Sequence, residues 1–249
     1  MKTTPFLIAL ALITISFSCA DSSANRSPAN DINNGFAVVE LFTSEGCSSC
    51  PPADKAVAQL LKEHRSNVYV LGYHVDYWDN LGWKDIFSNP AYTQIQREYA
   101  KALKLSSVYT PQIVVNGTEQ FVGSDGNKLN AAVNNDLQQA RDTKLDIDAR
   151  SGDGKTVTVN YSTDAGNAKL KIALIQLNAE NKIQRGENTG ATLHHVNIVR
   201  DLQTTSVTGK GNIRLNIPEG LSAKDCSVIA FTQNVSDNKI TSATEVDIH

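Results

Sequence analysis

The chain has 249 residues, and its 23 Lys and Arg against 26 Asp and Glu give a formal net charge of −3. The charges form no basic block, which argues against nucleic acid or an anionic membrane surface as a partner. The length is sufficient for two domains of ordinary size.

The N-terminus predicts an exported protein. Lys2 precedes an apolar run from Phe6 to Phe17 that is short for a membrane span and is followed by small residues, so we expect a signal peptide over residues 1–20. Cleavage after Ala20 would leave a soluble periplasmic protein, whereas lipid attachment at Cys19 would leave a membrane-tethered lipoprotein. The sequence leaves both open, and either compartment permits disulfides. Residues 21–35 predict a flexible tether.

A Cys-x-x-Cys pair follows the first predicted strand. Residues 36–42 form an apolar run, and the apolar spacing over residues 53–61 predicts a helix. Cys47 and Cys50 therefore lie where a strand ends and a helix begins, close enough to form a small disulfide ring. The unpaired N–H groups and the positive dipole end of a helix stabilise a thiolate. The pair thus predicts a reactive thiol and redox chemistry.

Strands and helices alternate as far as residue 143. Further strands are expected at 68–73, 108–115 and 120–123, and helices are expected to begin at Asn89-Pro90 and at Asp125. From Lys144, short alternating runs separated by turn residues are typical of an all-β sandwich. The predicted fold is an α/β domain over residues 36–143, with the order βαβαββα, followed by an all-β sandwich domain over residues 144–249.

Two separate motifs in the first domain resemble the thioredoxin superfamily. These are Cys-x-x-Cys after the first strand and Thr110-Pro111 before the third, so the α/β domain is expected to be thioredoxin-like. Residues 40–54, 73–79, 110–112 and 186–200 resemble a secreted bacterial family built on that fold, known as domain of unknown function 1223. That family supplies a fold and no settled substrate.

The resemblance implies a thiol–disulfide oxidoreductase that acts on the thiols or disulfides of protein substrates and needs no cofactor. Cys47 would be the nucleophile and Cys50 the resolving thiol. Pro111 would be a cis-proline that faces the disulfide and leaves the carbonyl of Thr110 free to bind an extended substrate. Glu40 falls near the position of the buried acid that accepts a proton from the resolving thiol.

Two other readings of the pair stay open. Cys47 and Cys50 could join His74, His194 or His195 in a copper or zinc site, since thiolate and imidazole suit both metals. The chain would then be a metal-binding or partner-binding module. The disulfide could also be inert and structural. The remaining cysteine, Cys226, is expected to be a small buried residue at the start of a strand.

The second half carries an unusual polar segment between His194 and Asp201. We expect His194 and His195 to have a structural or interdomain role rather than a catalytic one. The predicted join between the two domains is also short. Together these features predict that the β-sandwich domain docks on the thiol face and restricts access to it.

Overall fold

The structure is a computed structural model that describes residues 35–64 and 66–249. The predicted signal peptide, the possible lipid site at Cys19 and all of the tether except Gly35 lie outside the described residues. None of the described helices is long and apolar enough to cross a membrane.

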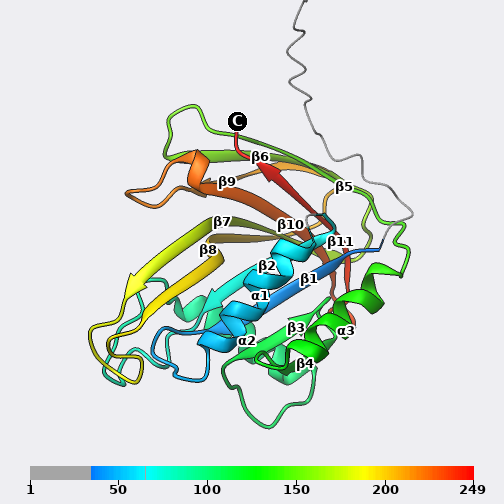
Figure 1. The fold of residues 1–249 in the computed structure, drawn as a ribbon. Coiled ribbons are helices and arrows are strands. Elements are labelled where there is room, and N and C mark those ends of the chain that lie inside the picture. The colour runs from blue at the N-terminus through cyan, green and yellow to red at the C-terminus, as the bar shows by residue number, and fades with distance from the viewer. Residues whose placement is uncertain (1–34, 65) are drawn as a thin grey trace, which may run out of the picture. The chain divides into compact units, whose positions relative to one another are not determined.

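Strands dominate the described residues, with 42% in strands and 19% in helices. The elements are β1 (Ala37–Thr43), α1 (Pro51–Glu63), β2 (Val68–His74), α2 (Pro90–Ala102), β3 (Gln112–Val115), β4 (Glu119–Val122), α3 (Gly126–Leu137), β5 (Leu145–Arg150), β6 (Thr156–Thr163), β7 (Ala168–Lys182), β8 (Thr192–Ser206), β9 (Lys210–Asn216), the short 3-10 helix η1 (Ala223–Asp225), β10 (Cys226–Asn234) and β11 (Ile240–Asp247) (Figure 1).

Eight of these strands form one mixed sheet in the order β11-β10-β7-β8-β2-β1-β3-β4. β1 runs parallel to β2, and β8 joins the free edge of β2 in parallel through Gly72 and Ile198. A methyl group at Gly72 would lie 3.4 Å from the carbonyl oxygen of Asn197. Glycine therefore leaves room for β8 to approach. The remaining strands β5, β6 and β9 form a second, three-stranded sheet.

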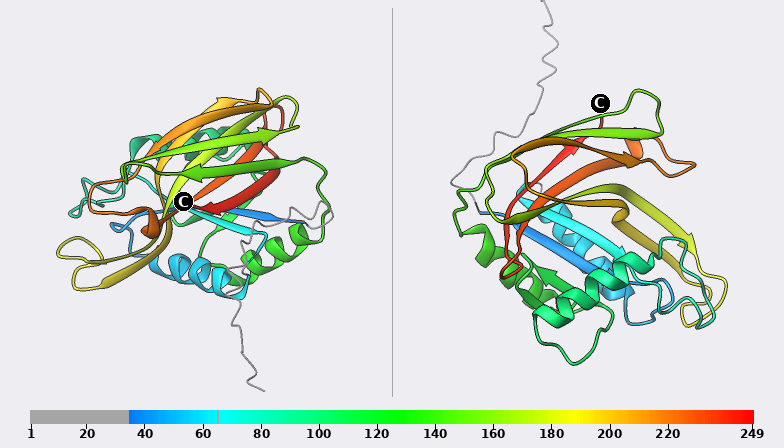
Figure 2. Two further views of the ribbon diagram at one scale, coloured as in Figure 1. Left: turned by 90° about the horizontal axis from the view of Figure 1, so that it is seen from above. Right: turned by 180° about the vertical axis from the view of Figure 1, so that it is seen from behind.

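The core lies on both faces of the large sheet. Every residue of β1 is buried, because helices cover both of its faces. Val39 and Leu41 pack with α1 and α3, whereas Val38 and Phe42 pack with the tyrosines of α2 and with β7 and β10. The opposite face of β7 and β10 packs against the three-stranded sheet (Figure 2).

The predicted fold class, a βαβαββα thioredoxin-like domain followed by an all-β sandwich domain, is wrong. The chain instead folds around a large mixed eight-stranded sheet and is mostly β. β7, β8, β10 and β11 lie in the residues that were expected to form a separate sandwich domain, but they belong to the same sheet as β1–β4. The physical reason is the pairing of β8 with β2, which joins the two halves of the chain into one sheet.

Candidate functional site

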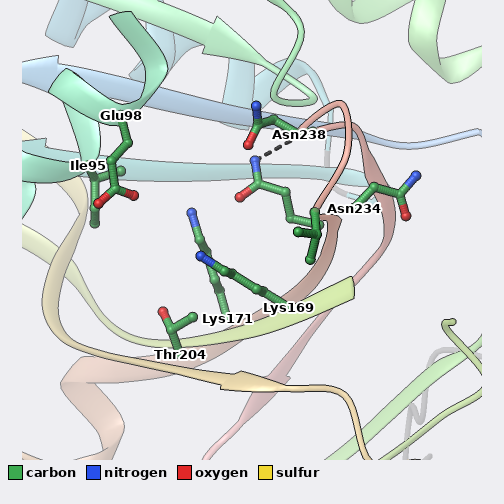
Figure 3. A pocket seen from close by; sticks show the side chains of 9 residues that line it. Ile95, Glu98, Lys169, Lys171, Thr204, Asn234 and Asn238 are labelled. Atoms are coloured by element: carbon green, nitrogen blue, oxygen red, sulfur yellow. Dashed lines mark hydrogen bonds between the residues drawn. The ribbon is translucent and has the colours of Figure 1, made fainter. Parts of the chain in front are cut away.

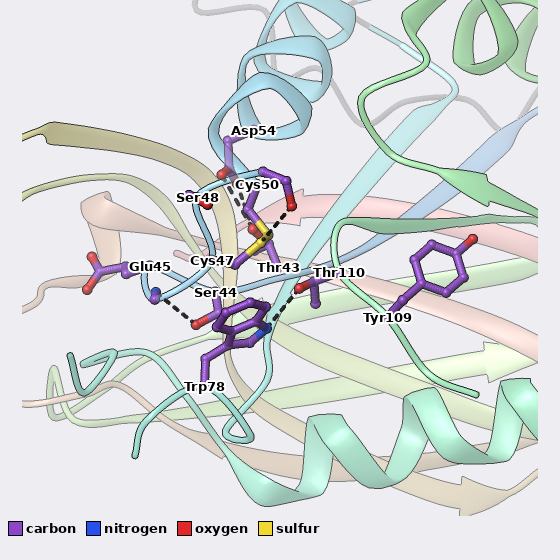
Figure 4. The surroundings of a disulfide bond; sticks show 12 residues. Thr43, Ser44, Glu45, Cys47, Ser48, Cys50, Asp54, Trp78, Tyr109 and Thr110 are labelled. Carbon is purple, nitrogen blue, oxygen red and sulfur yellow. Dashed lines mark hydrogen bonds between the residues drawn. A yellow bond between two sulfur atoms is a disulfide. The ribbon is translucent and has the colours of Figure 1, made fainter. Parts of the chain in front are cut away.

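A disulfide joins Cys47 and Cys50 at the start of α1 (Figure 4). β1 ends at Thr43, and α1 begins at Pro51, whose missing N–H costs nothing in the first helical turn. Both cysteines are fully buried. Ser48 and Ser49 between them are exposed, so the disulfide lies just below the surface. The hydroxyl of Ser49 contacts the Cys47 Sγ at 3.4 Å.

The predicted cis peptide bond between Thr110 and Pro111 is confirmed. The indole N–H of Trp78 donates to the Thr110 hydroxyl at 2.9 Å, and Figure 4 shows this pair in the surroundings of the disulfide. A methyl group at Gly46 would lie 3.0 Å from Trp78 Cβ, so the indole side chain packs against the residue before Cys47. Trp78 thus connects the Thr110 segment to the Cys-x-x-Cys segment.

Glu40 is not brought to the disulfide. Side chains alternate between the faces of a strand, and Thr43 on β1 reaches Asp54 of α1 while Glu40 points to the opposite face. There Glu40 accepts a hydrogen bond from Tyr99. Burial raises the pKa of Glu40, although Lys171 and two tyrosine hydroxyls act in the opposite direction. Glu40 therefore belongs to a polar group under α2, away from the face on which α1 lies.

A different set of buried ionisable groups surrounds the motif. His195 of β8 lies 3.5 Å from a carboxylate oxygen of Glu45 and 3.5 Å from one of Asp54. Burial alone would lower the pKa of His195, but the two carboxylates raise it to about 9. His195 is therefore an imidazolium at neutral pH. Its side chain is only 2% exposed, so the charges interact with little screening by solvent.

Glu45 is fixed by further donors. It accepts from the indole N–H of Trp83 at 2.8 Å and from the side-chain amide of Asn181 at 3.0 Å. Sequence analysis did not single out Glu45 or Asp54, although both lie in residues 40–54. The available signal was spacing, because Asp54 follows Cys50 by four residues on α1 and residues four apart share a helix face.

His74 is paired with Asp85, at 2.6 Å between Nδ1 and the carboxylate, and both side chains are buried. Burial acts to raise the pKa of Asp85. The charge and hydrogen bond of His74, together with backbone N–H donors, outweigh the effect of burial, so the pKa of Asp85 is lowered. The rings of His74 and His195 meet edge to face, 4.8 Å between centroids. In residues 35–64 and 66–249, no group of three or more His, Cys, Asp or Glu is placed to hold a metal ion.

The tip of the β7–β8 hairpin covers the motif. The Glu187 carboxylate accepts from the backbone N–H of Ser48 at 3.1 Å. Asn188 donates to the carbonyls of Glu45 and Cys47 at 2.8 and 3.1 Å. The C-terminal half of the chain thus contacts the thiol face, but it does so through a hairpin of the large sheet and not through the separate sandwich domain that was expected.

The other predicted residues lie apart from the motif. His194 is exposed and pairs with Glu180 at 3.1 Å. Cys226 is a free, buried cysteine at the start of β10, as predicted. Burial raises the pKa of the Cys226 thiol to about 11, so it stays protonated at neutral pH.

The comparison with family models finds a family without an assigned activity. The family model described as "Protein of unknown function (DUF1223)" matches residues 38–233. A crystal structure of a protein from Agrobacterium tumefaciens is similar, with a TM-score of 0.61 and 29% identity over 84% of this chain and 93% of that one. HBP35 of Porphyromonas gingivalis matches with a TM-score of 0.62 and 19% identity, over 87% of this chain and 76% of that one, and supports the fold alone. No curated protein matches the chain.

Proposed function

The chain belongs to the DUF1223 family, and we propose that it is an exported protein that exchanges disulfides with protein thiols through Cys47 and Cys50. The observation that carries the proposal is the disulfide at the N-terminus of α1, just below the exposed Ser48 and Ser49. A helix N-terminus stabilises the thiolate that such exchange requires. Export rests on the N-terminal sequence pattern, and attachment through Cys19 is one form of it.

The exchange balances as two thiolate displacements. A substrate thiolate attacks Cys47 Sγ, forms a mixed disulfide and breaks the Cys47–Cys50 bond, and the Cys50 sulfur leaves with the electron pair and takes up a proton. A second substrate thiolate then attacks the substrate sulfur of the mixed disulfide. This releases a substrate disulfide and the Cys47 thiolate. The reverse sequence reduces a substrate disulfide.

Asp54 and His195 are the candidate groups for handling the proton at Cys50. Asp54 lies one helical turn after Cys50 and contacts the imidazolium of His195. A buried sulfur that becomes a thiolate needs a nearby proton, because an unpaired charge is costly to bury. Trp78 and Thr110, which are joined by a hydrogen bond, lie beside the motif (Figure 4).

A substrate must displace part of the β7–β8 hairpin tip to reach Cys47, because both sulfurs are buried. The hydrogen bond made by Glu187 is exposed and those made by Asn188 are part-buried, and a typical hydrogen bond contributes only about 1 kcal/mol net. A protein partner that binds beside the tip can therefore compensate for the free energy of opening it.

Single cysteine variants test the proposal. In the reduced full-length protein, the Cys50→Ser variant should attack a peptide disulfide through Cys47, release one peptide thiol and remain trapped as the mixed disulfide, whereas Cys47→Ser should not. The pair in the parent protein should equilibrate with a glutathione buffer, which gives its reduction potential. Cys226→Ser is the matched control and should behave as the parent.

Equal trapping by the Cys47→Ser variant would contradict the assignment of the nucleophile. A pair that stays oxidised in the folded protein, in buffers that reduce other surface disulfides, would support a structural disulfide and overturn the proposal.

A further inference from the structure

A cavity of about 290 Å³ lies between α2, the first residues of β7 and the end of β10 (Figure 3). It shares no lining residue with the disulfide site, and its interpretation does not depend on the proposed redox function. Its volume is near the lower end of the range for small-molecule sites.

The central feature of this cavity is a buried lysine. Lys171 is 8% exposed, and its Nζ lies 5.7 Å from the ring centroid of Tyr99 and 5.6 Å from that of Phe231. Within the part of the chain that the structure describes, no atom accepts a hydrogen bond from this ammonium group. The carboxyls of Glu40 and Glu98 interact with the charge of Lys171, but its three N–H donors are left for a ligand or for solvent.

Other polar groups face the same space. Lys169 precedes Lys171 by two residues on β7, so both side chains project from one face of the strand. Figure 3 shows the two amines directed into the cavity, with Glu98 of α2 on the far side. Thr204 pairs with Lys171 across β7 and β8 and places a hydroxyl at the edge of the cavity.

We propose that this cavity binds a small organic monocarboxylate, with its carboxylate on Lys171 and Lys169. A carboxylate supplies the acceptors that the buried ammonium lacks. Among the lining residues, the charges of Lys169, Lys171 and Glu98 sum to +1. Glu40 also interacts with Lys171, but burial favours the neutral form of Glu40 by raising its pKa. The sum suits a single negative charge and disfavours a phosphate dianion beside Glu98. The side chains of Ile95 and Val235 give the cavity an apolar wall for the body of such an acid.

Titration calorimetry of the full chain with sodium benzoate, against inorganic phosphate at the same ionic strength, tests the proposal. Benzoate should bind saturably and at least tenfold more tightly than phosphate. Lys171→Met should weaken benzoate binding at least tenfold, and Lys169→Gln several-fold. Lys128→Met is the matched control. Lys128 also lies over an aromatic ring, that of Phe121, but it is on α3 and does not line the cavity.

A second pair of variants keeps the test decisive if Lys171→Met fails to fold. Val235 lines the cavity and is 52% exposed, so substitutions there are tolerated by the fold. Val235→Asp should weaken benzoate binding about tenfold by repulsion, and Val235→Lys should not. The proposal is overturned if benzoate shows no saturable binding, if phosphate binds as tightly, or if the two Val235 variants bind benzoate equally.

Discussion

Replacing His195 by glutamine should remove most of the pH dependence of stability between pH 6.5 and pH 9. In the folded protein the carboxylates of Glu45 and Asp54 hold the imidazolium in place and raise its pKa from 6.5 to about 9. A group whose pKa is raised by folding stabilises the protein fully below its unfolded pKa. That stabilisation is lost as the pH rises through the folded pKa.

The size of the effect follows from the two pKa values. A shift from 6.5 to about 9 corresponds to a contribution of about 3 kcal/mol at pH 6.5 that falls below about 0.5 kcal/mol at pH 9. The lowered pKa of Asp85 makes the same contribution to the free energy of unfolding throughout this range, because its carboxylate titrates only at acidic pH. The raised pKa of Cys226 begins to matter only above pH 9.

Urea unfolding of the oxidised protein at pH 6.5, 8 and 9 measures the effect. The His195→Gln variant should lose about 3 kcal/mol at pH 6.5 and little at pH 9. His194→Gln is the matched control, because that exposed side chain makes only a surface ion pair, and it should change stability by less than about 0.5 kcal/mol.

A His195→Gln variant that keeps the pH slope of the parent protein would contradict this prediction. A titration of the His195 imidazole near its ordinary pKa, measured by nuclear magnetic resonance, would contradict it as well.

Two further predictions concern the hairpin tip and a turn. Asn188→Ala removes two hydrogen bonds to the motif, so alkylation of Cys47 in the reduced protein should become about tenfold faster. Mass mapping of the alkylated protein measures this rate. An unchanged rate would mean that the tip does not limit access to Cys47. Gly117→Ala should cost about 3 kcal/mol in urea unfolding, because φ is +74° and the new methyl would lie 2.0 Å from the Asn238 carbonyl oxygen. Gly154→Ala, at φ +68° in open space, should cost only about 1 kcal/mol, and equal losses would contradict the steric argument.

Local patterns predicted the elements near the disulfide because each depends on residues close in sequence. The apolar run before Cys47 gives β1, and Pro51 with the apolar spacing after it gives α1. Asn89 and Asp125 cap α2 and α3 through their side chains, as expected at those positions. These features need no knowledge of strand partners.

The pairing of strands was not predictable in the same way. Alternation indicates which face of a strand is buried, but it does not name the neighbour of that strand. The contact of β8 with β2 depends on Gly72 and on Asn197, which has a φ of +49° and donates to the carbonyl of Val70. A glycine inside a predicted strand was the one signal that another backbone approaches there.

The misplacement of Glu40 has a simpler cause. Glu40 is two residues before Phe42 and three before Thr43, whose side chain reaches α1. Glu40 therefore shares a strand face with Phe42 and lies on the face opposite to Thr43. The alternation of side chains along β1 would by itself have excluded Glu40 from the face that packs against α1. The cluster of Glu45, Asp54 and His195, in contrast, joins segments about 140 residues apart, so only the tertiary structure brings it together.

The single sheet explains why the disulfide is covered. β7 and β8 have 15 residues each, or about 50 Å of strand, and β10 pairs with β7 only as far as Gln176. The remaining part of the hairpin extends past the other strands, and from it come the three side chains that fix the segment before the disulfide, Asn181, Asn188 and His195. The pairing of β8 with β2 directs this extension over the motif. We therefore expect selectivity for a thiol partner to depend on the hairpin, since a partner that cannot displace its tip does not reach Cys47.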